Sequence, residues 1–465
     1  MARKNAVSLD ALIPLGAEKL AQVILDEAET NPSFRKRVTA ALASTEGPDA
    51  VAKLIDRRLA ALERARAMVA WEKERAFAED LGATVDTITK ELGPLSPAHA
   101  VGRLLRFIDS HGSVFGRIDD SNGRIQDVYW RASEAIPDLV GKLPPGELAR
   151  LPERLLASLG KDTHGLAPRI AIAVTPLLPE PVLAAWDAML QKAEDVAGFV
   201  EIRQAIADAR GDLDGFLALE VRRLDWRQEP LKAAERLLAA NRLDEALVWV
   251  RREKKGSLAF ATESDIADGR INWFHDLERV GLEARILEAM KDRPAAQALR
   301  WAAFEATLNA DILRDYIRKL DDFMEYEEQD RAFALAAASP HAYTALAFFI
   351  AWPRLDLAAK LVLGKSDVWD GRHYGALGGA AAALEESFPL AATVLYRALL
   401  NAILARAKSP AYGHGASYLA KLGELAVDVS EGGGLESHAA YLLAIKKAHG
   451  RKVGFWSIVD GKNRS

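Results

Sequence analysis

Histidine is the residue type in this sequence best suited to acid–base or metal chemistry. Four of the nine histidines, His373, His414, His438 and His449, occur after residue 365. Zinc sites on helices use histidines three or four residues apart or a His-Glu-x-x-His pattern, and neither occurs here. These histidines could therefore cap helices or make buried hydrogen bonds. Alternatively, they could form a metal or catalytic cluster that only tertiary folding could assemble.

Nucleophilic chemistry has less support. The chain contains no cysteine, which excludes disulfides, thiolate metal sites and cysteine nucleophiles. It also lacks the Gly-x-Ser-x-Gly elbow that presents a nucleophilic serine. We therefore assign no catalytic residue, no metal ligand and no cofactor.

The segment from Ile118 to Ile125 superficially resembles a calcium loop, with Gly123 at the sharp turn. In that register Ile118 occupies the first ligand position and Tyr129 replaces the bidentate glutamate. Asp, Ser and Asn are good helix caps, so a capping turn is favoured over calcium binding or another polar ligand contact.

Two further stretches each have a functional and a structural interpretation. Gly375-Ala-Leu-Gly378-Gly379 could cradle a phosphate at a helix start, but no strand precedes it and close helix packing is favoured. The acidic stretch 321–330 could bind a basic partner, although a solvated surface between helices is favoured.

The C-terminal end is basic. Six cations, Lys446, Lys447, Arg451, Lys452, Lys462 and Arg464, face a single acid, Asp460, with Phe455 and Trp456 among them. This composition suits RNA stacking and phosphate contact or an acidic protein partner. It equally suits the polar cap of a terminal helix, whose carbonyl end favours cations.

A binding site is predicted where the C-terminal His, Tyr and Arg residues could converge. The candidates are His373, Tyr374, Arg397, His414, Tyr418, His449, Arg451, Lys452 and Trp456. Convergence of His373, Arg397, His414 and Tyr418 in one deep pocket would favour a small ligand, whereas an open groove would favour a protein or peptide.

The elements that must position these residues are predicted from a recurring phrase. Asp212-Leu-Asp-Gly-Phe216, Arg242-Leu-Asp-Glu-Ala246 and Arg354-Leu-Asp-Leu-Ala358 each follow one apolar-periodic helix and open the next. Spacing near thirty residues is typical of helix-turn-helix repeats, which must stack to bury their apolar faces. We predict an all-α helical-hairpin array, with Leu243 and Ala246 buried between helices.

Composition and turn residues support that fold class. Half of the 465 residues are hydrophobic, with only 32 Gly and 19 Pro. Leu143-Pro-Pro-Gly146 interrupts the helical pattern, which predicts three segments: a helical segment 1–145, a repeat array 146–365 and a C-terminal segment with its cap 366–465. Only 170–174 is ambiguous between helix and strand.

Targeting and charge patterns limit the expected localisation and the expected classes of partner. The N-terminal residues lack the apolar core of a secretory signal, and no apolar run reaches the ~20 residues that span a bilayer. The formal net charge of −5 gives no overall basic footprint for nucleic acid. We therefore expect a cytoplasmic protein that does not bind membranes, with a nucleic-acid partner unlikely.

Several C-terminal phrases resemble an uncharacterised family of bacterial helical proteins. They include Arg372-His373-Tyr374, Tyr396-Arg-Ala-Leu-Leu400, Tyr412-Gly-His-Gly-Ala-Ser-Tyr-Leu419 and His449-Gly-Arg-Lys452. The resemblance implies a helical fold and no active site. Separately, 238–247 is similar to the turn of a tetratricopeptide repeat, although neighbouring units do not meet its consensus.

From these patterns we expect a non-catalytic helical-repeat scaffold that binds a protein or peptide on its concave face. One alternative is a small-ligand or enzymatic pocket formed by the C-terminal His, Tyr and Arg residues. The other is weak nucleic-acid binding by the basic tail.

Overall fold

A computed structural model shows that the chain is all-helical, as predicted. It describes residues 8–193, 199–253, 261–270, 276–321, 323–429 and 434–462, and these contain no β-strand. The ambiguous stretch 170–174 lies in the helix Leu166–Val174. Within the described residues, no helix combines the length and apolarity needed to cross a membrane.

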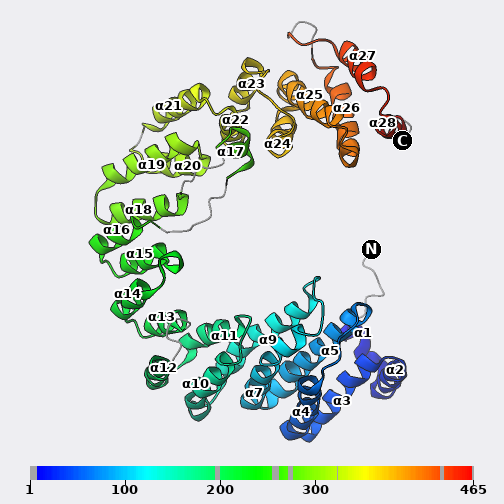
Figure 1. Cartoon of the computed structure of the whole chain (residues 1–465), viewed down its shortest axis with the longest axis vertical. Coiled ribbons are helices and arrows are strands. Elements are labelled where there is room, and N and C mark those ends of the chain that lie inside the picture. The colour runs from blue at the N-terminus through cyan, green and yellow to red at the C-terminus, as the bar shows by residue number, and fades with distance from the viewer. Residues whose placement is uncertain are drawn as a thin grey trace. The chain divides into compact units, whose positions relative to one another are not determined.

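The chain divides into two compact units, unit 1 (Met1–Leu224) and unit 2 (Asp225–Ser465) (Figure 1). This division falls inside the predicted array 146–365, and the three-segment division remains a prediction.

Unit 1 contains α1 (Leu9–Leu12), η1 (Ile13–Leu15), α2 (Ala17–Thr30), α3 (Pro32–Glu46), α4 (Pro48–Arg64), η2 (Trp71–Lys73), α5 (Glu74–Asp86), η3 (Thr87–Leu92), α6 (Gly93–Leu95), α7 (Pro97–Ile108), α8 (His111–Phe115), α9 (Arg124–Val140), α10 (Pro145–Leu159), α11 (Leu166–Val174), η4 (Thr175–Leu177), α12 (Glu180–Lys192), α13 (Val200–Ala209) and α14 (Leu213–Arg222). Unit 2 contains η5 (Asp225–Arg227), α15 (Pro230–Ala239), α16 (Leu243–Val250), α17 (Glu263–Ala267), α18 (Leu277–Ala289), α19 (Arg293–Thr307), α20 (Ala310–Arg318), α21 (Glu325–Ala338), α22 (Ala342–Ala351), α23 (Leu355–Gly364), α24 (Tyr374–Leu384), α25 (Pro389–Ala405), η6 (Ser409–Ala411), α26 (Tyr412–Leu425), α27 (His438–His449) and α28 (Val453–Lys462).

The recurring sequence phrase corresponds to a recurring turn. In each case the first residue of the phrase donates its backbone N–H to the carbonyl five residues earlier: Asp212 to Ala207 at 2.8 Å, Arg242 to Leu237 at 2.9 Å and Arg354 to Phe349 at 2.9 Å. The same bond joins Asp292 to Leu287 at 2.9 Å, in a turn without the phrase. This six-residue closure satisfies carbonyls at the end of one helix while the next helix begins.

The position four residues after this cap is buried at every one of these turns. It is occupied by Phe216, Ala246, Ala296 and Ala358. Ala246 is therefore buried as predicted. Leu243 is only half-buried, because the first position of the new helix lies at the rim of the hairpin rather than inside it.

The loop before α9 is a capping turn, as favoured from the sequence. The Asp120 carboxylate accepts the backbone N–H groups of Ile125 and Gln126, each at 2.9 Å. Gly123 has φ of 71°, the left-handed conformation that glycine tolerates best. The polar residues of this loop thus start a helix.

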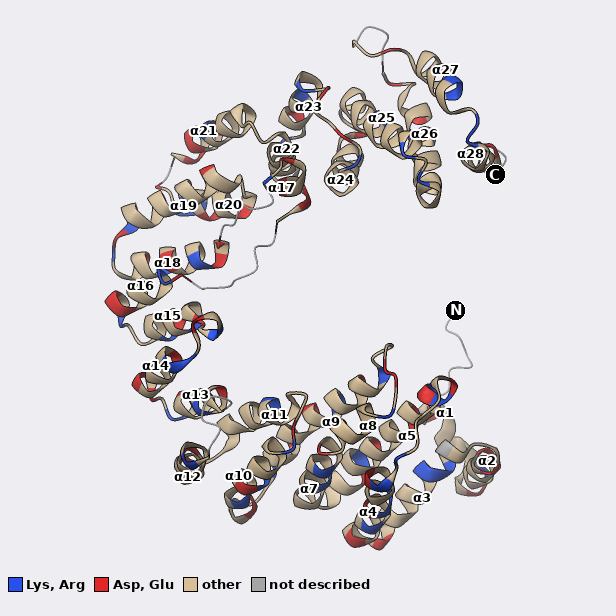
Figure 2. Cartoon of the chain, in the orientation of Figure 1, with Lys and Arg blue, Asp and Glu red and all other residues tan. Residues whose placement is uncertain are grey.

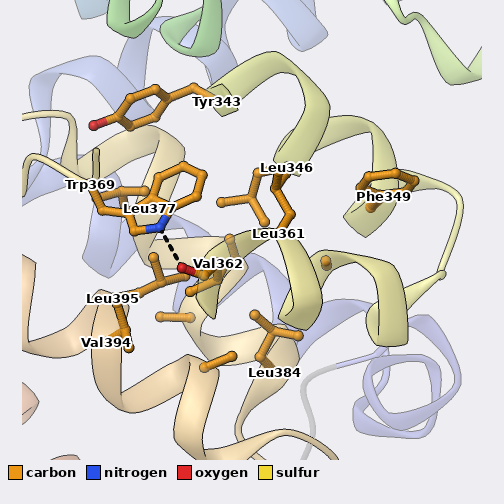
Figure 3. Packing of buried hydrophobic residues seen from close by; sticks show 14 of the residues in the cluster. Tyr343, Leu346, Phe349, Leu361, Val362, Trp369, Leu377, Leu384, Val394 and Leu395 are labelled. Atoms are coloured by element: carbon orange, nitrogen blue, oxygen red, sulfur yellow. Dashed lines mark hydrogen bonds between the residues drawn. The ribbon is translucent and has the colours of Figure 1, made fainter. Parts of the chain in front are cut away.

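Each unit has its own hydrophobic core. Trp186, Tyr129 and Phe107 are among the largest fully buried side chains of unit 1, as Phe304, Phe349 and Phe455 are in unit 2. Figure 3 shows the unit 2 core where α22, α23, α24 and α25 meet, with the Trp369 indole N–H donating to the Val362 carbonyl at 3.0 Å. This bond fixes the loop that leads from α23 to α24.

Candidate functional site

The loop between α23 and α24 is held from two sides. The Tyr343 hydroxyl donates to the Val368 carbonyl at 3.1 Å and accepts the Asp370 N–H at 2.6 Å. The Asp370 carboxylate accepts the backbone N–H of Arg372 at 2.9 Å and its guanidinium Nε–H at 2.6 Å. The hydrogen bond from Arg372 lowers the pKa of Asp370, although partial burial opposes it. The loop is therefore ordered, and Arg372 has a fixed direction.

Gly371 brings this loop against α25. Its backbone lies so close to the Ala398 carbonyl and to Leu399 that a Cβ atom would overlap them. Only glycine allows this approach, and the approach closes one side of the cavity described below.

Gly371→Ala is expected to destabilise unit 2 by about 2 kcal/mol, because the added methyl group forces the loop away from α25. Gly378→Ala on α24 is the matched control, since a Cβ there meets no atom within 4 Å. The control should leave stability unchanged or raise it slightly, because alanine favours helix. Urea unfolding of both variants measures this difference, and equal stabilities would contradict the close approach.

A pocket of about 510 Å³ lies between this loop, α25 and the start of α26. We call it the α25–α26 pocket. Its lining residues are Gly371, Arg372, Tyr374, Leu399, Ala402, Ile403, Arg406, Lys408, Pro410, Ala411, His414 and Tyr418. The lining comprises aliphatic side chains of α25, which we call the floor, two tyrosines, a histidine and three exposed cations, which we call the rim.

The charged residues that line the pocket are all cations. None of the lining residues is acidic. Arg372 is paired with Asp370, whereas Arg406 and Lys408 are exposed and make no ion pair in the described part of the chain. Burial raises the pKa of the Tyr418 phenol. The pocket thus offers positive charge next to apolar surface.

Three of the nine predicted site residues meet in this pocket: Tyr374, His414 and Tyr418. Tyr374 is 67% exposed, and the Tyr418 ring packs on Tyr396 with centroids 5.5 Å apart. His373 precedes Tyr374 but packs edge-on against Tyr343 instead, at 5.4 Å.

Arg397 lies outside the pocket. It is buried, donates to the Glu436 carbonyl at 2.8 Å and lies over the Tyr441 ring at 4.3 Å. Burial lowers its pKa and that of the nearby His438, whose pKa is also lowered by repulsion from Arg397. This arginine joins α25 to α27 and is not presented to a ligand.

The remaining predicted residues form a separate group at α27 and α28. The Trp456 indole donates to the His449 carbonyl at 3.0 Å, and the Lys446 ammonium lies 5.7 Å from the Trp456 ring centroid. Phe455 is fully buried and packs edge-on against Tyr412, so it cannot stack on a base. Arg451 is exposed and Lys452 is half-buried beside this group. Both aromatic rings of this group thus pack within the chain, and its role as a terminal cap or as a binding site remains a prediction.

Two other sequence hypotheses concern a phosphate site at Gly375 and a metal site. The Glu263 carboxylate packs directly on Gly375 at the start of α24, which disfavours a phosphate there. In the described residues no three His, Asp or Glu side chains gather as a potential metal site.

The rim cations Arg406 and Lys408 were absent from the predicted site. A usable signal exists, since no Asp or Glu occurs between Glu386 and Glu424 while Arg397, Arg406, Lys408 and Lys421 do. A long stretch with cations and no acids predicts a locally positive surface.

Comparison with protein families matches residues 2–201 and 196–458 to a single family. The chain belongs to DUF6880, a family of unknown function. The match spans both units and agrees with the predicted membership of an uncharacterised helical family. A bacterial source and a relationship to tetratricopeptide repeats remain predictions. The curated proteins contain no match to the chain.

Proposed function

We propose that this DUF6880 chain is a non-catalytic binding protein whose α25–α26 pocket holds an acidic, partly apolar segment of a partner protein. The observation that carries this proposal is that Arg406 and Lys408, which make no ion pair among the described residues, line the pocket together with apolar side chains of α25. Electrostatic complementarity favours a partner that supplies the missing carboxylates.

The apolar part of the pocket supplies the anchor for such a segment. Leu399, Ala402 and Ile403 lie along one face of α25 and line the floor. A leucine or phenylalanine inserted there would leave water and gain roughly 1.5–3 kcal/mol. Carboxylates flanking that side chain would reach the cationic rim. The floor and the rim together therefore favour a peptide with one apolar side chain between acidic residues.

The same lining argues for binding rather than catalysis. His414 is the one histidine among the lining residues, and no carboxylate lines the pocket to orient it. The nearby Asp370 is already engaged by Arg372. A histidine that acts as general base is commonly oriented by a third group such as a carboxylate, and the pocket lining supplies none.

A small anionic ligand is the second candidate, and the pocket volume favours it. About 510 Å³ lies within the ~300–1,000 Å³ range of small-molecule sites. The exposed positions of Tyr374, Lys408 and Pro410 extend the contact surface beyond the cavity and favour the longer peptide.

The proposal predicts the outcome of a peptide selection. Short displayed peptides captured on the purified full chain should be enriched in leucine or phenylalanine flanked by Asp and Glu. A fluorescein-labelled peptide of that composition should then bind in a polarisation assay, more weakly as salt is raised. Arg406→Glu and Lys408→Glu should each weaken binding roughly tenfold or more, about 1.4 kcal/mol.

Lys360→Glu is the matched control. Lys360 is an exposed cation of unit 2, on α23, that does not line the pocket. It makes no ion pair among the described residues, so its reversal changes net charge equally and should leave the affinity unchanged. Enrichment of basic or neutral peptides, or equal weakening by all three reversals, would refute a specific acidic-peptide site.

A further inference from the structure

Unit 1 contains a second cavity that the proposed function does not use. It has a volume of about 390 Å³ and lies between α3, α4 and the junction of α5 with η3. Its lining residues are Arg35, Lys36, Thr39, Leu54, Ile55, Arg57, Arg58, Ala61, Ala83, Thr84 and Thr87. We call it the α3–α4 pocket. Four of these side chains are cationic and none is acidic, and Figure 2 shows the basic residues of α3 and α4 in blue.

The carboxylates that pair with these cations are fewer than the cations themselves. One carboxylate, Asp80, accepts from the Lys36 ammonium at 2.6 Å and also contacts the Arg58 guanidinium. Arg57 is exposed and has no ion-pair or hydrogen-bond partner within the described ranges. Arg35 donates to the carbonyls of Ala28 and Glu29 at 2.7 and 2.9 Å, which are uncharged partners.

The guanidinium of Arg58 is held in place before any ligand arrives. Its Nε–H donates to the Thr84 hydroxyl at 2.9 Å, and that hydroxyl donates to the Asp80 carbonyl at 3.0 Å. A fixed guanidinium loses little side-chain entropy when it binds an anion, and its planar fork matches two oxygens of a phosphate.

The local backbone is also unusual. η3 (Thr87–Leu92) is a π-helix that follows α5. Its first residue, Thr87, lines the pocket together with Ala83 and Thr84 of α5. A π-turn widens the helix by one residue and occurs frequently at functional sites. Here it continues the helix that supplies the third wall of the cavity.

The crowded cations repel one another. Partial burial, and then repulsion from Arg58, lower the pKa of Lys36, and burial lowers the pKa of Arg58. Both groups would be stabilised in their charged forms by an anion bound between them.

We propose that the α3–α4 pocket binds the phosphate group of a small phosphomonoester. A dianionic phosphate matches the excess of cations better than a single carboxylate does, and arginine is the preferred bidentate partner of phosphate. Leu54, Ile55 and Ala83 supply apolar surface beside the cations for the organic part of the molecule.

Isothermal titration calorimetry of the full chain tests this with phenyl phosphate, inorganic phosphate and phenol. Phenyl phosphate should bind, inorganic phosphate should bind roughly tenfold more weakly because it lacks the apolar contact, and phenol should not bind. Raising the salt concentration should weaken both phosphates. Equal affinities for phenyl phosphate and inorganic phosphate would assign the site to free phosphate and contradict the predicted contact with an organic group. Binding of phenol would overturn the whole proposal.

Arg57→Gln should reduce the affinity for phenyl phosphate roughly tenfold or more without lowering thermal stability, because Arg57 makes no hydrogen bond or ion pair with the described residues. Arg37→Gln is the matched control, since Arg37 is an exposed cation of the same helix as Lys36 and does not line the cavity. Equal affinities in Arg57→Gln, Arg37→Gln and the unmodified chain would overturn the assignment of this pocket. The acidic-peptide assay on unit 2 should be unaffected by either variant, so the two proposals fail independently.

Discussion

Replacing Ala246 with aspartate is expected to lower the free energy of unfolding by roughly 4 kcal/mol, because it places an unpaired carboxylate in a fully buried position. Ala246 has 0% of its surface exposed, at the position four residues after the recurring turn cap. Its helix, α16, packs against both α15 and α18. The aspartate could be accommodated only by separating these helices or by protonating the new carboxyl group.

Urea unfolding followed by circular dichroism at neutral pH measures this loss. Val248→Asp is the matched control, because Val248 lies on the same helix and is 60% exposed. Valine and aspartate have similar helix propensities, so Val248→Asp should cost less than about 1 kcal/mol. Leu243→Asp should fall between the two, since Leu243 is half-buried. Similar losses for Ala246→Asp and Val248→Asp would mean that the register of the recurring hairpin is wrong.

The hairpin register was predictable because local residues specify it. Gly211 and Asn241 adopt φ of 68° and 58°, and both residue types tolerate the left-handed conformation that closes the turn. The same conformation occurs at Lys291, with φ of 66°. Lysine has no preference for that region, so the sequence indicated a turn only through the later Pro294. Tertiary packing fixes this turn where the residue type does not.

The candidate site was predicted in part, and helical geometry explains which part. Leu399, Ala402, Ile403 and Arg406 follow the three-and-four spacing of a single helix face, and this face lines the pocket. Arg397 lies two residues before Leu399, about 200° around the helix, and therefore points toward α27. Residue type alone grouped Arg397 with His414 and Tyr418 of α26, whereas the direction of Arg397 on α25 separates it from them.

The aromatic residues at the C-terminus show what composition cannot decide. Phe455 and Trp456 are adjacent in sequence, yet Phe455 is fully buried and Trp456 is only partly buried. Adjacent residues on a helix point about 100° apart, so one enters the core while the other packs on the surface beside Lys446. An aromatic residue among cations predicts base stacking only when its ring is free, which requires knowledge of the packing against α26.

The charge network around the buried Arg300 in unit 2 should be sensitive to the loss of this cation. Arg300 is 3% exposed and contacts Glu288 at 2.8 Å and Asp315 at 2.5 Å. These bonds join α19 to the end of α18 and to α20. Arg300→Met should lower the free energy of unfolding by about 3 kcal/mol, because two partly buried carboxylates lose their shared partner.

Arg318→Met is the control that isolates the effect of burial. Arg318 contacts the same carboxylate, Asp315, at 2.6 Å, but its side chain is 72% exposed. An exposed ion pair contributes ~1 kcal/mol or less, so this variant should remain close to the unmodified chain in a urea titration. Equal losses in the two variants would show that burial of Arg300 does not matter.

The dependence on pH provides the final test of the network. Burial raises the pKa of Glu288 and of Asp315, but hydrogen bonds from Lys319 and Arg300 to Glu288, and from Arg300 and Arg318 to Asp315, bring each pKa below its usual value. The resulting stability is full above the unfolded pKa values of 4.5 and 3.8 and is lost as pH falls through the lower folded values. The stability difference between the unmodified chain and Arg300→Met should therefore be constant from neutral pH down to about pH 5 and shrink below about pH 4. A difference that grows in acid would mean that these carboxylates are not stabilised in their charged forms by Arg300.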